Sequence, residues 1–185
     1  FKIIERHTME SPVTNKEFDN WSTLGSTVFT KNRIVLMPEV GGKSGAMYGK
    51  YFTEYSEKDE WIVDLKIRIG NEDKTAKGGN GVGLFYLKNI NGEDFGQGQF
   101  GYSKQYNGLA VLLNTVLQKE EDGKPKNYIQ AFTNDGSKNV NFMKIKNEKN
   151  CREQIRNLPG DQPFHLRVEY KNPQISIFYY DYDIQ

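Results

Sequence analysis

The sequence is poor in the two residue types that most often carry chemistry in enzymes. Its 185 residues include one cysteine, Cys151, and two histidines, His7 and His165. A lone cysteine excludes a disulfide within the chain and cannot build a zinc site. No G-x-S-x-G elbow is present either, so nucleophilic hydrolysis finds no support. His165 falls on the polar side of an alternating segment, where we expect a surface position.

An excess of charge of one sign is also missing. The chain has 25 basic and 24 acidic residues, for a formal net charge of +1, whereas a nucleic-acid-binding protein usually has a basic stripe. We therefore expect no nucleic-acid partner, and we interpret the basic run over residues 144–156 as a solvated face.

Long apolar runs are absent as well. No stretch approaches the roughly 20 apolar residues of a membrane-spanning helix, and no signal peptide is visible. The chain begins with Phe1 rather than Met. We therefore expect it to be a processed or excised piece, with any targeting or anchoring segment outside it.

What the sequence does contain is a period of two. Residues 61–69 alternate between apolar and polar side chains, which is typical of a half-buried antiparallel strand. We expect the apolar residues to be buried, namely Trp61, Val63, Leu65, Ile67 and Ile69. We expect the polar residues to be exposed, namely Asp64, Lys66 and Arg68. Residues 164–170 alternate in the same way, and a turn at 171–173 leads into residues 175–180, which predicts a hairpin.

Further strands are predicted over residues 33–37, 45–52, 82–87, 109–114, 128–133 and 139–143. Residues 82–87 and 109–113 are apolar on both faces, so we expect them to lie centrally and to be covered on both sides. Only residues 150–157 have a helical pattern, and briefly. Many short strands with almost no helix predict an all-β sandwich or barrel, and the length predicts a single domain over residues 1–185.

Three glycines, at positions 78, 79 and 81, surround Asn80 just before the apolar strand at 82–87. Glycine weakens a strand unless a bend, a bulge or a close backbone approach requires it. Either this stretch is a structural corner or something docks against the backbone at Asn80. A second glycine-rich stretch, GQGQFG at 96–101, matches a dinucleotide pattern, but no βαβ unit surrounds it and we predict a loop.

A glycosidase would need two carboxylates a short distance apart on one face of a strand. Glu60 and Asp64 have a suitable spacing. Asp64 shares its face with Lys66 and Arg68, however, which favours a solvated cross-strand face. The acidic residues at 120–122 lie beside a glycine in a predicted loop. We therefore predict that the chain is not an enzyme.

Several blocks of the sequence occur in a recognisable order. FDNWSTLGSTVFTKNRIVLMPEVGGKSGAMYG, residues 18–49, resembles the opening of the L-type, or legume-like, lectin domains of ER–Golgi cargo receptors. WIVDLKIRIG resembles the long strand that follows, and GGNGVGLFYLKN resembles the family's G-D-G-L-A-I-W-Y block. YNGLAVLLNT resembles its hydrophobic strand ending in D-T/S, and FTNDGS resembles its N-N-G turn. NCREQIRN and HLRVEYKNPQISIFYY resemble its Cys-plus-Arg segment and terminal hairpin.

The resemblance implies a two-sheet antiparallel β-sandwich of the legume-lectin, concanavalin-like jelly-roll type. It also implies binding of high-mannose glycans, assisted by Ca²⁺, in the lumen of the early secretory pathway. In the family, an aspartate of the G-D-G block accepts hydrogen bonds from mannose hydroxyls. The glycines would then let the backbone and one side chain form the floor of a sugar site.

The sequence departs from the family at these functional positions. The aspartate of the G-D-G block is Asn80, and the first metal-binding aspartate is Asn114. The aromatic two residues on is Val116, and the asparagine after it is Gln118. The loop that brings a histidine and a second aspartate reads NVNFMKIKN. We therefore expect a sugar site at Asn80, Gly81, Asn114 and Gln118, with no metal and no cofactor, that binds weakly and without Ca²⁺.

Other expectations also follow from the resemblance. Family domains continue past the terminal hairpin, so we expect the C-terminal strands, the membrane anchor and any oligomerisation segment to lie beyond Gln185. Cys151 would be the first half of the family's disulfide and would here be an accessible thiol; a buried free thiol is the alternative. The expected partners are high-mannose glycoproteins or protein cargo. The rival hypothesis is a pseudo-lectin, in which the sandwich serves as a protein-interaction module without sugar binding.

Overall fold

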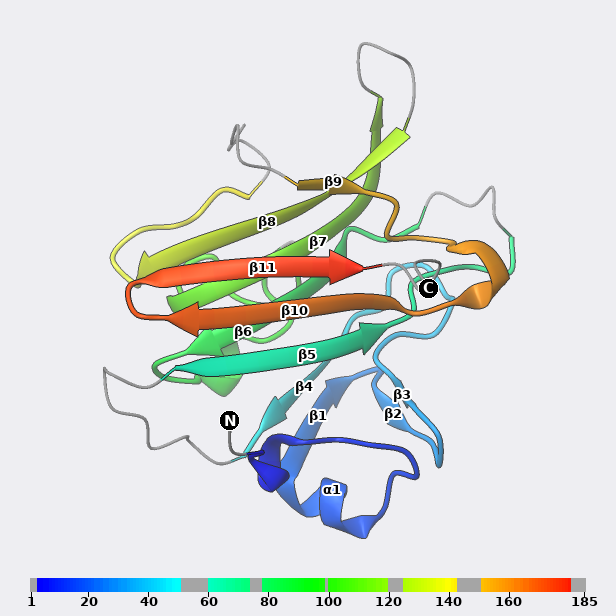
Figure 1. Ribbon diagram of the computed structural model, residues 1–185, viewed down its shortest axis with the longest axis horizontal. Coiled ribbons are helices and arrows are strands. Elements are labelled where there is room, and N and C mark those ends of the chain that lie inside the picture. The colour runs from blue at the N-terminus through cyan, green and yellow to red at the C-terminus, as the bar shows by residue number, and fades with distance from the viewer. Residues whose placement is uncertain are drawn as a thin grey trace.

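The computed structural model describes residues 3–50, 60–73, 78–98, 100–119, 125–142 and 151–180. Within these residues the chain is built from antiparallel strands, as Figure 1 shows. The described residues also form one helix, α1 (Asn15–Asn20), and three short 3₁₀ turns, η1 (Glu5–His7), η2 (Gly92–Asp94) and η3 (Pro159–Asp161). No helix among the described residues is long and apolar enough to cross a membrane.

The largest sheet has four strands in the order β6-β7-β8-β9. These are β6 (Gly81–Leu87), β7 (Asn107–Lys119), β8 (Pro125–Asp135) and β9 (Cys151–Glu153). A second sheet has the order β11-β10-β5 and consists of β5 (Trp61–Ile67), β10 (Phe164–Lys171) and β11 (Gln174–Tyr180). In Figure 1 it lies in front of the first sheet, so the two form stacked layers. This confirms the predicted all-β sandwich.

Two small sheets lie beside these layers. The strands β1 (Trp21–Gly25) and β4 (Gly45–Gly49) pair with each other, as do β2 (Val28–Phe29) and β3 (Ile34–Val35). The strand predicted over residues 33–37 is thus only two residues long. The predicted strand at 45–52 ends at Gly49, and its last two residues lie outside the described part of the chain.

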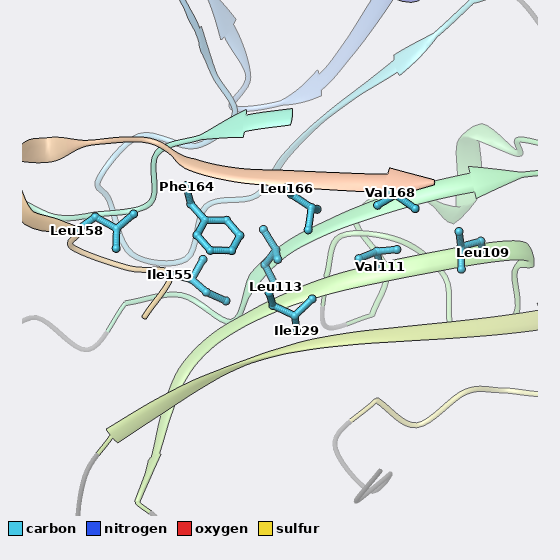
Figure 2. Close-up of a cluster of buried hydrophobic side chains, with 9 residues drawn as sticks. All are labelled: Leu109, Val111, Leu113, Ile129, Ile155, Leu158, Phe164, Leu166 and Val168. Atoms are coloured by element: carbon cyan, nitrogen blue, oxygen red, sulfur yellow. The ribbon is translucent and has the colours of Figure 1, made fainter. Parts of the chain in front are cut away.

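The main core fills the space between the two layers (Figure 2). Alternate residues of β7, namely Leu109, Val111 and Leu113, face the alternate residues Phe164, Leu166 and Val168 of β10. All six side chains are buried. The period of two seen in residues 164–170 therefore marks the inner face of β10, as predicted.

A second core covers the opposite face of the four-stranded sheet. Ala110 and Leu112 of β7 point into it and pack with Tyr102, Tyr106 and Phe142 from the connecting segments. Burial of both its faces explains why residues 109–113 are apolar throughout, and this prediction is confirmed. The other strand predicted to be central, β6, is instead the end strand of its sheet in the described structure, and Tyr86 on it is exposed.

The alternation in β5 is confirmed in direction. Asp64, Lys66 and Arg68 are exposed, while Trp61, Leu65, Ile67 and Ile69 pack against the core. The apolar residues are only half-buried rather than buried, because β5 pairs on one side with β10 and is the last strand of its sheet.

Two predictions of local structure were wrong. Residues 139–142 form no strand, because Val140 N donates to Lys104 O (3.0 Å) and Phe142 fills the second core. Residues 151–157 are not helical, because residues 151–153 pair with β8 as β9, and Ile155 N donates to the Oδ1 atom of Asn127 at 3.1 Å. In both segments, contacts with distant parts of the chain override the local pattern.

Sequence reasoning also missed helix α1. Its N-terminus is a capping box, in which Thr14 caps the first turn and the Glu17 carboxylate accepts from Thr14 N at 2.7 Å. The pattern T-x-x-E in TNKE is the known signal for this arrangement.

Candidate functional site

The glycine-rich segment lies where β6 begins and where the paired part of β7 ends. Gly81 is the first residue of β6 and lies opposite Asn114 in the β6–β7 ladder. One residue earlier, the Asn80 carbonyl accepts a hydrogen bond from Thr115 N at 3.1 Å. The fold therefore brings Asn80, Gly81 and Asn114 together, although 33 residues separate Gly81 from Asn114 in the sequence.

Close approach to the backbone requires glycine at position 81, and a positive φ beside the Arg156 side chain favours it at position 78. Gly81 has φ +138°, and a β-carbon there would overlap the carbonyl oxygen of Leu113 on the neighbouring strand. A β-carbon on Gly78 would overlap the Arg156 guanidinium. A β-carbon on Gly79 would meet nothing within 4 Å. The segment is thus a structural corner in which two of the three glycines let other groups approach the backbone.

The two amide side chains of the site differ in their exposure. Asn80 is exposed, whereas Asn114 is only 4% exposed. Asn114 follows Ala110 and Leu112 on the face of β7 that carries the second core, because side chains alternate along a strand. Asn80 is therefore the amide that a ligand in solution meets first, and Asn114 lies beneath the surface.

Gln118 lies beyond an irregularity in the sheet. The β7–β8 pairing changes register between Asn114 and Gln118, and pairing resumes with Gln118 opposite Lys126. A bulge of this kind re-aims the strand and is common next to binding sites. The Gln118 side chain lies outside what the structure describes, so its place in the site stays a prediction.

Two residues next to the site have positions that the sequence analysis did not foresee, and for Arg156 the prediction of a solvated basic face was wrong, because this side chain is buried. Thr115 is 2% exposed, and its hydroxyl donates to Gly79 O at 3.0 Å. Arg156 is 7% exposed and forms an isolated bridge with Ile69. Burial lowers the pKa of its guanidinium, while the charge of Glu39 acts in the opposite direction. For Thr115 a signal exists: with Asn114 it forms a polar pair that directly follows the apolar run of β7.

The donor groups at this corner do not suit Ca²⁺. Calcium takes six to eight oxygen ligands, and carboxylates supply the opposing charge. Asn80 and Asn114 offer neutral amides, and the Thr115 hydroxyl and the Gly79 carbonyl, which bond to each other, are neutral as well. Among the described residues, no three histidine, cysteine or acidic side chains are grouped closely enough to hold a metal ion.

The structure does not favour Glu60 and Asp64 as the two carboxylates of a glycosidase. Asp64 accepts two hydrogen bonds from Arg167 on β10, at 2.7 Å from Nε and 2.9 Å from Nη2. These bonds to the Asp64 carboxylate raise the pKa of the Arg167 guanidinium above its ordinary value. Asp64 thus belongs to the solvated cross-strand face that the sequence favours. The described residues of the GQGQFG stretch, 96–98, 100 and 101, lie in no helix or strand, and Gly96 N donates to Gly101 O at 2.9 Å.

His165 lies on the same outer face but is half-buried rather than fully exposed. It lies opposite Lys66 of β5 and Tyr180 of β11, and its ring is 5.6 Å from that of Tyr180. Burial lowers its pKa, and the positive charge of Lys66 lowers it further.

Known proteins resemble this chain in sequence. The vesicular integral-membrane protein VIP36 of Canis lupus familiaris is 23% identical over 162 residues, which are 85% of this chain and 43% of that protein. Protein EMP46 of Saccharomyces cerevisiae is 32% identical over 159 residues, 85% of this chain and 32% of that protein. The chain thus spans less than half the length of either relative.

Solved structures share the fold. The exoplasmic/lumenal domain of VIP36 in its Ca²⁺/Man-bound form has a TM-score of 0.79 and 21% identity, and the match covers 100% of this chain and 75% of that domain. The metal-free carbohydrate recognition domain of Emp46p has a TM-score of 0.73 and 24% identity, with 97% and 80% covered. Residues 2–184 match the model of the legume-like lectin family. The chain belongs to this family.

Proposed function

We propose that this chain binds high-mannose glycans of glycoproteins, weakly and without Ca²⁺, through Asn80 and Gly81, with Asn114 and Gln118 beside them. The observation that carries the proposal is the exposed Asn80 amide, presented at the start of β6 on a backbone bonded to β7. An amide both donates and accepts, so it can bond to neighbouring hydroxyls of a sugar ring. The shared fold with a mannose-bound form of VIP36 supports this choice of ligand.

Weak binding follows from the charge of the site. A carboxylate accepts charge-assisted hydrogen bonds from sugar hydroxyls, and these are roughly twice as strong as bonds between neutral groups. Asn80 offers only the neutral kind. Asn114 likewise brings no negative charge that would favour a divalent cation.

The setting that we propose is the lumen of the secretory pathway. The matched structures include the exoplasmic/lumenal domain of VIP36, which is named a vesicular integral-membrane protein. We propose that residues 1–185 act as a single lectin domain of a cargo receptor in the ER, the ER–Golgi intermediate compartment or the Golgi. Its membrane anchor would lie outside this chain.

The test is a glycan array followed by calorimetric titration of the chelator-treated protein with a mannose oligosaccharide. Asn80→Ala should abolish the heat of binding. Asn89→Ala is the matched control, because Asn89 is also exposed but follows the opposite end of β6. If Asn80→Ala and Asn89→Ala bind mannose as well as the unaltered chain, Asn80 is not part of the site.

Calcium is tested in the same titration. Added CaCl₂ should give no binding isotherm and should leave the mannose affinity unchanged. A one-to-one Ca²⁺ isotherm that Asn114→Ala removes would overturn the metal-free mechanism and would place a cation beside β7.

The pseudo-lectin remains the second candidate, and one observation favours it. Asn114 is only 4% exposed, so a sugar can reach little of this side chain. A protein-interaction module would give no signal on the array with any high-mannose glycan, while capturing protein cargo from which the glycans have been removed enzymatically.

A further inference from the structure

Thr115 makes two hydrogen bonds to the segment that carries Asn80. Its hydroxyl donates to Gly79 O at 3.0 Å and its backbone N donates to Asn80 O at 3.1 Å. Thr115 is 2% exposed and belongs to β7, whereas its two acceptors lie 36 and 35 residues away in the sequence. We propose that Thr115 is a positioning residue that fixes the direction of the Asn80 side chain; this inference rests on the proposed sugar site.

The two bonds act on the two peptide planes that flank Asn80. A peptide unit is planar, so the backbone at one residue is determined by the orientations of the planes before and after it. The Gly79 carbonyl belongs to the plane before Asn80, and the Asn80 carbonyl belongs to the plane after it. Thr115 bonds to both carbonyls and therefore restrains both backbone dihedral angles of Asn80, and with them the direction of its Cα–Cβ bond.

The neighbouring glycines make this restraint necessary. Glycine has more backbone freedom than any other residue, and Asn80 has one on each side. Gly81 is held by its pairing with Asn114 in the β6–β7 ladder. Gly79 lies before β6 and outside this ladder. The Thr115 hydroxyl bonds to the Gly79 carbonyl and supplies a restraint that the ladder does not.

A threonine is well suited to this position. Its β-branched side chain has few rotamers, so the hydroxyl is directed at little entropic cost. A valine has nearly the same shape but no hydroxyl, and it would leave the Gly79 carbonyl without this donor. A serine keeps the donor and loses one methyl group. The pair Thr115→Val and Thr115→Ser therefore separates the hydrogen bond from the packing of the side chain.

The first measurement needs no ligand. Amide hydrogen exchange is followed by NMR at position 115, whose N–H bonds to Asn80 O. The resonances of the Asn80 side-chain amide are recorded as well. In Thr115→Val we expect faster exchange at position 115 and averaged Asn80 side-chain resonances, while Thr115→Ser keeps the pattern of the unaltered chain. A Thr115→Val spectrum with unchanged exchange and an unchanged Asn80 amide overturns the inference.

The second measurement is mannose affinity by calorimetry. Thr115→Val should lose roughly three- to tenfold in affinity, the range that corresponds to one hydrogen bond, and Thr115→Ser should recover most of it. Thr27→Val is the control, because the Thr27 hydroxyl also bonds to carbonyls, of Leu36 at 3.2 Å and Ala46 at 3.1 Å, but lies outside the two main sheets. Thr27→Val should lose stability and keep its affinity.

The outcomes distinguish this inference from the proposed function. If the unaltered chain binds no mannose, the proposed function fails, and the exchange data still decide whether Thr115 orients Asn80. If the unaltered chain binds and Thr115→Val binds equally well, the positioning role is wrong while the sugar site stands. If Thr115→Val does not fold, Thr115→Ala is compared with Thr27→Ala in the same two measurements.

Discussion

Substitution of Gly81 by alanine tests the close approach at the start of β6. Gly81 has φ +138°, a conformation open almost only to glycine, and a β-carbon there would overlap the Leu113 carbonyl oxygen. Backbone strain of this kind costs about 1–3 kcal/mol. The steric overlap adds about 1–3 kcal/mol, because a carbonyl in a sheet cannot move aside as a flexible side chain can. We therefore expect Gly81→Ala to lower the free energy of unfolding by roughly 2–6 kcal/mol.

Gly79→Ala is the matched comparison two residues earlier. The φ of Gly79 lies outside the left-handed range, and a β-carbon on it meets nothing within 4 Å. Alanine at such a position is tolerated and can stabilise by about 0.4–1 kcal/mol, because the unfolded chain loses freedom.

Urea unfolding followed by circular dichroism measures both variants. Domains of this size unfold with total free energies of about 5–15 kcal/mol, so the loss in Gly81→Ala should move the midpoint clearly. Equal midpoints for Gly81→Ala and the unaltered chain, or an equal loss in Gly79→Ala, would refute the argument from close approach.

Three further predictions concern titration and thiol chemistry. Burial raises the pKa of Tyr106 to about 12. Because the unfolded chain loses this proton near pH 10, the free energy of unfolding should fall by about 1.4 kcal/mol per pH unit between pH 10 and about 12. Urea unfolding of Tyr106→Phe should show a smaller decline. Burial lowers the pKa of His165, so its stabilising contribution should be present above pH 6.5 and be lost as the pH falls; an NMR titration giving a pKa above 6.5 would contradict this. Cys151 in the native chain should react with a thiol reagent, and labelling only after denaturation would favour the buried thiol.

The candidate site shows how far local patterns reach. The glycines around Asn80 indicate either a corner or a docking point, and the sequence leaves this choice open. The structure explains two of them by the Leu113 carbonyl and the Arg156 guanidinium. Neither group is near residues 78–81 in the sequence, so no local pattern could have identified it. The roles of Asn80, Asn114 and Gln118 in sugar binding stay predictions that the titrations above address.

The sequence by itself determined the class of fold and the faces of its main strands. Burial on one face produces the alternation in residues 61–69 and 164–170, and burial on both faces produces the unbroken apolar run at 109–113. The polarity of each side chain therefore indicates which face is buried. Only the tertiary structure decided the course of residues 151–157 and the order of strands in each sheet. Ile155 N bonds to Asn127 across 28 residues, and the Thr115 hydroxyl bonds to Gly79 across 36. In both bonds a backbone group is paired with a side chain from a distant segment, and the packing of whole layers decides which segments meet.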